Sequence, residues 1–381
     1  MNKNISNVHN CYGCGMCATV CGQKIINIDL NKDGFYEPHV SDESKCTNCG
    51  LCTDVCAYLH NKLSLTKTEI HPYAAWSKNQ SIRKECSSGG VSFEIGKYLL
   101  NQGYKVCGVK YDASNNRAVH YIASSIEELI PSIGSKYIQS YTVDGFKAIN
   151  RKEKYLITGT PCQIDSFRRY IQKYHCEDNF VLLDFFCHGV PSMWLWKKYT
   201  ELAKNQVGQI TYASWRNKQT GWHDSWAMRI DGEKENEKMN SKEKNHIESR
   251  RSQGDIFYQL FLNDCCLGKQ CYVNCKYKYN HSSADIRIGD LWGKTYQNDE
   301  EGVSSVVAFT KKGHEILQQC DCTLIEHTFD VVAEGQMKST PLITQKYHIA
   351  MTLLKTNLTI TTIAKLFSVY LKIYRHLKLK K

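Results

Sequence analysis

Two cysteine runs decide how the front of this chain folds: CYGCGMCATVC at residues 11–21 and CTNCGLCTDVC at residues 46–56. Both have the spacing Cys-x2-Cys-x2-Cys-x3-Cys. Three thiolates at this spacing on a tight loop can surround one cubane, while the fourth, which we expect at a helix start, points to a second cubane. The runs therefore predict a ferredoxin-type module that holds two [4Fe-4S] clusters.

The crossed geometry predicts two ligand sets, Cys11, Cys14, Cys17 and Cys56 for one cluster and Cys46, Cys49, Cys52 and Cys21 for the other. Between the runs, residues 25–30 resemble a strand, 31–34 contain turn residues, and 35–38 resume the strand. A hairpin there would bring the two cysteine loops face to face. Gly22 and Ala57 stand where a proline usually follows the fourth cysteine, which loosens the turn but removes no ligand.

Two other uses of these cysteines fit less well. Zinc also binds Cys-x2-Cys pairs, but two complete four-cysteine runs match the ferredoxin spacing better. Disulfides need an oxidising compartment, and nothing else in the sequence indicates one.

The overall composition is that of a globular protein. A chain of 381 residues, 42% of them apolar, is long enough for two or three domains. Residues 1–7 precede no apolar run, and no stretch of about eighteen apolar residues follows, so we expect neither a secretory signal nor a spanning helix. These features favour a cytoplasmic location.

The formal charge of +11 raises the question of an anionic partner. The positive excess is concentrated at the end of the chain, where apolar residues at 366–374 interleave with Lys372, Arg375, Lys378, Lys380 and Lys381. This pattern predicts a basic amphipathic helix that either lies on a membrane surface or packs its apolar face on the body. No motif typical of nucleic-acid recognition is present, so we expect no nucleic-acid partner.

Strands and helices alternate after the cysteine module. Strand patterns at 105–111, 155–158 and 180–186 are separated by helical patterns after residues 90, 125, 163 and 192. The alternation predicts an α/β domain with a mixed, partly parallel sheet behind the α+β ferredoxin-like module. We divide the chain into a ferredoxin-type domain (1–62), a linker (63–80), two α/β parts (81–150 and 151–330) and a helical basic tail (331–381).

Three unusual loops occur at strand and helix ends: CSSGG at 86–90, GTPCQ at 159–163 and CHGVPS at 187–192. Because α/β sheets bind ligands where strands end and helices begin, we expect these loops to form the walls of one site. A further segment, CCLGKQCYVNC at 265–275, precedes IGDLWG at 288–293. Dense cysteine in a reducing compartment indicates a second metal site, whereas Cys107, Cys176, Cys320 and Cys322 are interpreted as buried thiols.

These motifs, together with GSKY at 134–137, resemble the coenzyme F420 hydrogenase/dehydrogenase beta-subunit family over about residues 80–310. Many bacterial members carry a ferredoxin module in front. The resemblance implies FAD beside a further [4Fe-4S] cluster. It assigns that cluster to Cys187, Cys266, Cys271 and Cys275, with Cys162 as the main competitor and the choice between Cys265 and Cys266 open.

The resemblance also implies a flavin site. Its residues are Ser87, Ser88, Gly89 and Gly90 at the pyrophosphate, Lys136 as a cation for the phosphates, and Thr160, Cys162 and Gln163 in the neighbouring loop. The alternative for 87–90 is a plain helix N-cap. His188 either relays a proton to the reduced flavin or is structural. The aromatic and charged residues either line a substrate pocket or belong to the core: Trp215, Arg216, Trp222, His223, Asp290 and Trp292.

We therefore expect an iron–sulfur flavoprotein oxidoreductase that takes electrons from a redox partner protein and passes them through FAD to a small two-electron acceptor. The acceptor would be a deazaflavin or an organic substrate, for example in surface-polysaccharide synthesis. One alternative is an electron-transfer subunit with no substrate of its own. Another is a structural iron–sulfur protein whose flavin site has decayed.

Overall fold

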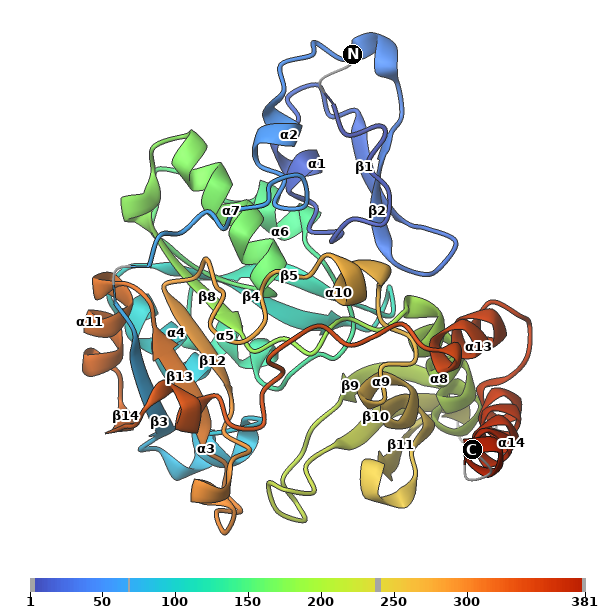
Figure 1. Cartoon of the computed structure of the whole chain (residues 1–381). Helices are drawn as coiled ribbons and strands as arrows, with labels where there is room; N and C mark the ends of the chain where they lie inside the picture. The colour runs from blue at the N-terminus through green and yellow to red at the C-terminus, as the bar shows by residue number, and fades with distance from the viewer. Residues whose placement is uncertain (1–3, 68, 237–240, 379–381) are drawn as a thin grey trace.

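The N-terminal module is a short antiparallel hairpin flanked by two short helices (Figure 1). The computed structural model describes residues 4–67, 69–236 and 241–378, with the backbone alone for 235, 236, 241, 242 and 372–378. The module consists of α1 (Met16–Val20), β1 (Ile26–Leu30), β2 (Tyr36–Val40) and α2 (Leu51–Asp54). The predicted hairpin is confirmed, because β1 pairs antiparallel with β2. Its turn is held by Asn31, whose Oδ1 accepts bonds from the backbone N–H groups of Asp33 and Phe35.

The fourth cysteine of each run lies at the end of a helix, so the prediction of a helix start is wrong. Cys21 caps the C-terminus of α1, and Cys56 follows the last residues of α2. The helices begin earlier than expected because Gly15 and Gly50, at φ 71° and 76°, turn the chain directly after the second cysteine.

A large mixed sheet forms the body of the described chain. Its nine strands lie in the order β14 (Cys322–Glu326), β3 (His71–Ser77), β13 (Ser304–Ala308), β12 (Ile286–Asp290), β8 (Phe180–Phe185), β7 (Tyr155–Thr158), β4 (Lys105–Asp112), β5 (Arg117–Ala123) and β6 (Ser140–Tyr141). The pairs β4–β7, β7–β8, β8–β12 and β5–β6 are parallel, and the others are antiparallel. The predicted mixed, partly parallel sheet is confirmed, and strands from both predicted α/β parts contribute to it.

The segment predicted as a linker contains β3, which is a strand inside the sheet. β3 pairs antiparallel with β13 and β14, and Tyr73, Ala74 and Ala75 are buried. The sequence prediction missed this strand because its partners lie more than 200 residues away and its small residues give a weak local pattern.

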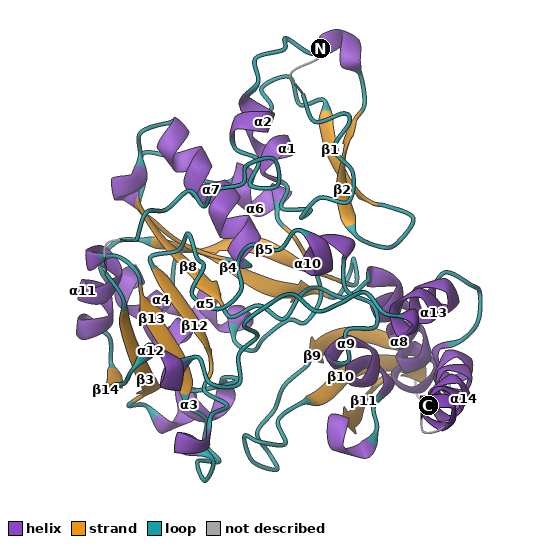
Figure 2. Cartoon of the chain, in the orientation of Figure 1, coloured by secondary structure: helices purple, strands orange, loops and turns teal. Residues whose placement is uncertain are grey.

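Helices cover both faces of the sheet (Figure 2). On β7, Leu156 packs in the cluster of α4 (Val91–Asn101) and α11 (Lys311–Gln319), whereas Ile157 packs in the cluster of α7 (Pro161–Lys173). Successive side chains of a strand point to opposite faces, which explains the nearly continuous apolar sequence of β7 and β8. The N-terminal module packs on the α7 side, together with α6 (Val143–Lys147). The remaining short helices are α3 (Gln80–Glu85), α5 (Ile126–Leu129), α10 (Lys269–Val273) and α12 (Phe329–Val332).

A second, three-stranded sheet packs with the C-terminal helices. It comprises β9 (Gln209–Ser214), β10 (Ala227–Asn236) and β11 (Ser241–Arg250), covered by α8 (Met193–Val207), α9 (Ile256–Leu262), α13 (Gln345–Leu354) and α14 (Ile360–Lys378). Ile360, Ile363 and Phe367 of α14 are buried in this core, so the apolar face of the helix packs on the body. The predicted membrane contact rests on Lys372, Arg375, Lys378, Lys380 and Lys381, whose side chains lie outside the described residues. Within the described part of the chain, no helix has the length and apolarity needed to cross a membrane.

Candidate functional site: three cysteine groups and a cavity

The first cysteine group surrounds a small apolar cavity in the N-terminal module. Cys11, Cys14 and Cys17 line it, and Cys56 reaches it from the second run. Burial, together with the neighbouring Cys14 thiol, raises the pKa of Cys56 to about 11. Four thiols gathered in an apolar cavity fit a bound metal cluster, because a metal centre stabilises thiolates that burial otherwise keeps protonated.

The second cysteine group lies nearer the surface. Burial raises the pKa of Cys52, and the neighbouring thiols of Cys49 and Cys21 add to the effect. Cys46 belongs to the same loop and accepts a contact from Asn4 Nδ2 at 3.5 Å. Cys49 is exposed, so this group is open to solvent.

A third cysteine group lies between the N-terminal module and the large sheet. Burial, together with the neighbouring thiols of Cys187 and Cys275, raises the pKa of Cys271 to about 12. The pKa of the buried Cys162 is raised by burial and by the thiols of Cys187, Cys14 and Cys271. Cys162 therefore lies within electrostatic reach of Cys187 and Cys271 and also of Cys14 in the first group, and it packs against the same aromatic cluster as Cys275.

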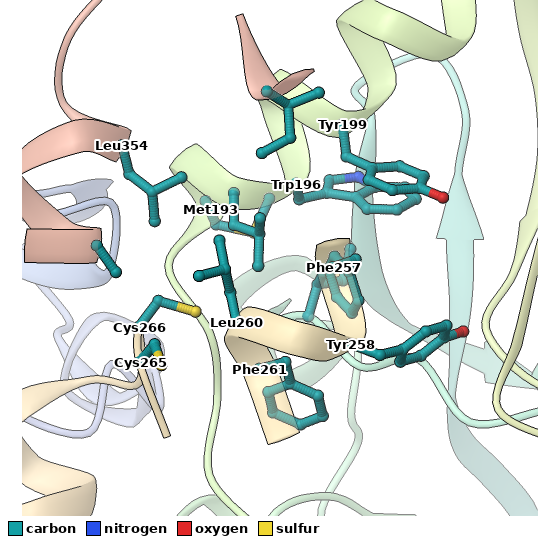
Figure 3. Close-up of a cluster of buried hydrophobic side chains, with 14 of the residues drawn as sticks. Met193, Trp196, Tyr199, Phe257, Tyr258, Leu260, Phe261, Cys265, Cys266 and Leu354 are labelled. Carbon is teal, nitrogen blue, oxygen red and sulfur yellow. The ribbon is translucent and has the colours of Figure 1, made fainter. Parts of the chain in front are cut away.

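Cys266, our predicted ligand, lies elsewhere. Its side chain is fully buried in the hydrophobic core, near Leu260 and Met193 (Figure 3). Cys265 lies in the same core, and the Cys266 carbonyl accepts a hydrogen bond from the Ser192 backbone at 2.8 Å. The structure thus brings Cys162 to the third group in place of Cys266. Cys162 is the main competitor that the resemblance implies, and its place in the first turn of α7 favours it further, because a helix N-terminus stabilises a thiolate.

Hydrogen bonds join the first group to α7, the helix whose first turn carries Cys162. Ser166 Oγ accepts bonds from Cys14 Sγ at 3.2 Å and from the Ala57 backbone N–H at 3.1 Å. A proline at position 57 could not donate the second bond, which explains the departure from the usual sequence. Tyr12 packs edge-on against Tyr277, and Cys162 and Cys275 pack against the same aromatic cluster.

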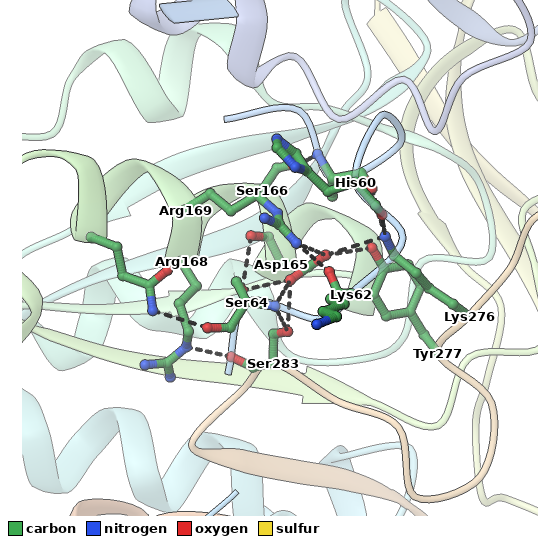
Figure 4. Close-up of polar contacts among 12 residues, drawn as sticks. His60, Lys62, Ser64, Asp165, Ser166, Arg168, Arg169, Lys276, Tyr277 and Ser283 are labelled. Carbon is green, nitrogen blue, oxygen red and sulfur yellow. Dashed lines mark hydrogen bonds and ion pairs between the residues drawn. The ribbon is translucent and has the colours of Figure 1, made fainter. Parts of the chain in front are cut away.

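A buried carboxylate fixes this junction (Figure 4). Asp165 accepts hydrogen bonds from Ser64 N at 2.8 Å, Ser283 Oγ at 2.7 Å and Tyr277 Oη at 2.8 Å. Its side chain is fully buried, and Lys276 Nζ lies 3.9 Å away. Because buried charges persist only when paired and hydrogen-bonded, this network holds the exit of the N-terminal module, α7 and the segment after Cys275 in one arrangement.

The three unusual loops meet at one cavity of about 560 Å³, as predicted. Its lining includes residues of 86–90, 159–163 and 187–190, together with the GSKY segment at 134–137. Cys187 belongs both to this lining and to the third cysteine group, so a cluster there would adjoin whatever fills the cavity. The helices α4 and α7 start at the cavity wall. Among the described residues no side chain caps α4, whereas α7 begins with Pro161, which has no N–H, and is capped by Thr160 and Gln163.

Most of the predicted flavin residues line this cavity: Ser87, Ser88, Gly90, Lys136, Thr160 and Gln163. Gly89 does not; a Cβ there would lie 2.4 Å from the Ala75 carbonyl oxygen, so this glycine permits close packing against β3. The side-chain amide of Gln163 caps the start of α7. Its Oε1 accepts a hydrogen bond from the Thr160 backbone N–H, and its Nε2 donates one to Ser140 Oγ.

The side chain of Lys136 is turned inward. Its Nζ donates hydrogen bonds to the carbonyl oxygens of Pro131, Ser132 and Ile133 at 2.9–3.0 Å. Burial lowers its pKa to about 7. The ammonium group therefore ties down the turn after α5, and in this arrangement its donors do not face the cavity.

His188 lines the cavity next to Cys187. Its Nε2 lies 2.9 Å from Asp264 Oδ1, and its ring packs edge-on against Phe261. Sequence reasoning missed Asp264, which lies directly before the late cysteine segment and has a left-handed backbone at φ 57°. A histidine oriented by a carboxylate can hold or release a proton.

The aromatic and charged residues that the sequence suggested for a substrate pocket divide between the cavity and the core. His223, Asp290 and Trp292 line the cavity, whereas Trp215 and Trp222 are fully buried. The buried Arg216 joins the two sets, with Nη1 at 3.0 Å from Asp290 Oδ2. Its guanidinium also lies over the rings of Trp226 and Trp292.

Comparisons with known proteins agree with this organisation. The sequence profile for the C terminus of the Coenzyme F420 hydrogenase/dehydrogenase beta subunit matches residues 152–328, and the profile for the N terminus of the same beta subunit matches residues 72–146. A 4Fe-4S dicluster domain matches residues 10–59. Among solved structures, a chain of the xenon-derivatised F420-reducing [NiFe] hydrogenase complex from Methanosarcina barkeri is 18% identical, with a TM-score of 0.44 over 81% of this chain and 90% of that chain. No curated protein matches the chain.

Proposed function

Since the chain belongs to the coenzyme F420 hydrogenase/dehydrogenase beta-subunit family and carries a 4Fe-4S dicluster domain, we propose that it is an iron–sulfur flavoprotein oxidoreductase. Electrons would enter through the N-terminal module and leave through FAD to a two-electron acceptor. When bound, the clusters exchange single electrons and FAD connects them to two-electron chemistry.

The order of the cysteine groups is the observation that carries this proposal. The second group contains the exposed Cys49, and the first group contains Cys14. The third group contains Cys187 at the cavity wall. Such a series has a surface end for a redox partner and a cavity end for a small molecule. Tyr12 and Ser166 would hold the first and third groups at a constant separation.

We assign ligands from this arrangement. Each of the first two clusters would take three cysteines from one run and the last cysteine of the other, as the spacing predicts. The third would take Cys162, Cys187, Cys271 and Cys275. These half-buried thiols raise one another's pKa, which suits a metal cluster better than free thiols.

The cavity suits a flavin in size and polarity. Its volume of about 560 Å³ lies within the range of ligand sites, about 300–1,000 Å³. The N-terminus of α4, which no side chain of the described residues caps, would favour the negative pyrophosphate, because a helix start presents unpaired N–H groups and a partial positive charge. In this proposal Asp264 orients His188, which would hold or release a proton at the cavity wall.

The acceptor is proposed as a deazaflavin, which the family description names, or an organic substrate of similar reactivity. The donor is proposed as a partner protein that docks near Cys49. If the chain instead served as an electron-transfer subunit, it would keep clusters and flavin but show no turnover without its partner.

Anaerobic purification followed by iron, sulfide and flavin quantitation tests the proposal. About twelve irons with one FAD per chain would support three cubanes feeding a flavin. About eight irons with no flavin would contradict the flavoenzyme function and leave a ferredoxin module on an α/β domain.

A further inference from the structure

Two histidines and a glutamate meet at the start of β3, apart from the cysteine groups and the cavity. The nearest donor atoms of Glu69, His71 and His314 all lie within 4.8 Å of one another. His71 Nε2 is 3.1 Å from Glu69 Oε2. The rings of His71 and His314 pack edge to face, with centroids 3.9 Å apart. Residues far apart in the sequence thus present three metal-binding groups in one place.

His314 carries a polar atom that the protein itself leaves unpaired. Its Nδ1 is buried and has no hydrogen-bond partner among the described residues. The His71–Glu69 contact satisfies those two side chains but not this nitrogen. Leaving a buried polar atom without a partner destabilises the protein, so a ligand that used its lone pair would be favoured.

We propose that Glu69, His71 and His314 bind a divalent transition-metal ion of the zinc type. Imidazole nitrogens with one carboxylate oxygen suit this class, whereas calcium and magnesium prefer oxygen ligands alone. Ligand atoms on a tetrahedral zinc ion lie roughly 3.3 Å apart, given bonds of about 2.0–2.1 Å. The Glu69–His71 pair is already at that separation, and a side-chain rotation would bring in His314.

The site is open on one side. The side chains of His71 and Glu69 are 32% and 33% exposed. This leaves a route for the ion and room for a water molecule as the fourth ligand. The two half-buried histidines lie on regular elements, His71 on β3 and His314 on α11. These elements limit the movement of the side chains and favour binding with a defined geometry.

The ion would fasten the segment that leaves the N-terminal module to the body. Glu69 lies at the end of that segment, His71 opens β3, and His314 belongs to α11. We therefore expect the metal to stabilise the attachment of the module rather than to take part in electron transfer.

Zinc counting on the holoprotein tests the inference. Protein purified anaerobically with its clusters intact is equilibrated with buffered zinc, passed through a desalting column and analysed for metal. The wild type should retain one zinc, and Glu69→Gln and His314→Gln should bind it at least about ten-fold more weakly. His39→Ala, which changes an exposed histidine on β2, is the matched control and should retain the ion.

X-ray absorption at the zinc edge identifies the ligands. The proposal expects a first shell of nitrogen and oxygen at about 2.0 Å. A sulfur shell at about 2.3 Å would place zinc on cluster cysteines and overturn the proposal. Failure of the wild type to retain zinc, or equal retention by Glu69→Gln, would also overturn it. Because Glu69 is partly exposed, this variant decides the question even where His314→Gln does not fold.

Discussion

Replacing Cys162 by alanine should remove the third cluster, whereas replacing Cys266 should leave it in place. The two residues offer an informative pair, since both are free cysteines, Cys162 half-buried and Cys266 buried, and sequence reasoning favours Cys266. The structure places Cys162 beside Cys187 and Cys271. It places Cys266 in a hydrophobic core, where Cys265 is the cysteine that perturbs its pKa.

The two variants should differ in their iron content and in their stability. Cys162→Ala should lower the iron content from about twelve to about eight per chain, because one [4Fe-4S] cluster is lost. Cys266→Ala should keep about twelve irons and destabilise the protein by about 1 kcal/mol. That cost corresponds to removing one buried group of methylene size from a packed core.

Iron and sulfide analysis of the anaerobically purified variants provides the assay, with anaerobic urea unfolding to measure the stability of Cys266→Ala. Flavin content reports whether the cavity remains intact in both variants. About eight irons in Cys266→Ala with about twelve in Cys162→Ala would refute the placement and restore the sequence assignment. Equal iron contents in the two variants would refute the third cluster as proposed.

Three further perturbations test the packing around the site. Burial lowers the pKa of His120 to about 4, so its neutral form stabilises the fold above pH 6.5 and this contribution is lost as pH falls towards 4. When the pH is lowered from 7 to 5, the free energy of unfolding of His120→Gln, measured by thermal unfolding, should therefore fall by about 2 kcal/mol less than that of wild type. An equal fall in both proteins would contradict the argument. Arg287→Met leaves Asp184 buried and unpaired and should cost about 3–5 kcal/mol in urea unfolding, most of it restored when Asp184 is also replaced by leucine. Gly89→Ala forces a Cβ against the Ala75 carbonyl and should cost more than about 1 kcal/mol and reduce flavin retention, whereas full retention with unchanged unfolding would argue against that contact.

Much of the candidate site could be predicted because its signals are local. The two cysteine runs, the turn at 31–34 and the strand and helix patterns of β7, α7 and β8 each lie within a short segment. Turn residues, ligand spacing and hydrophobic periodicity act over such lengths. The convergence of three loops on one cavity was also accessible, since each loop occurs where a strand ends or a helix begins.

Other features depend on contacts that only the folded chain supplies. The strand β3 resembles a linker in sequence and becomes a sheet strand because β13 and β14 bond to both of its edges. The side chain of Lys136 is predicted at a phosphate but is held by the carbonyl oxygens of the preceding turn. Local propensity predicts neither the strand state of β3 nor the orientation of the Lys136 side chain. Packing brings β13 and β14 to β3, and the path of the backbone places the carbonyl oxygens around Lys136.

The sequence by itself determined that this protein has a two-cluster module, an α/β body and an additional group of cysteines, since spacing and periodicity are properties of continuous segments. Only the tertiary structure decided that Cys162 joins Cys187, Cys271 and Cys275 while Cys266 faces the core. The physical reason is that a ligand set is defined by where side chains point after packing. Cys162 and Cys271, more than a hundred residues apart, become neighbours only when the sheet, α7 and the late loop pack together.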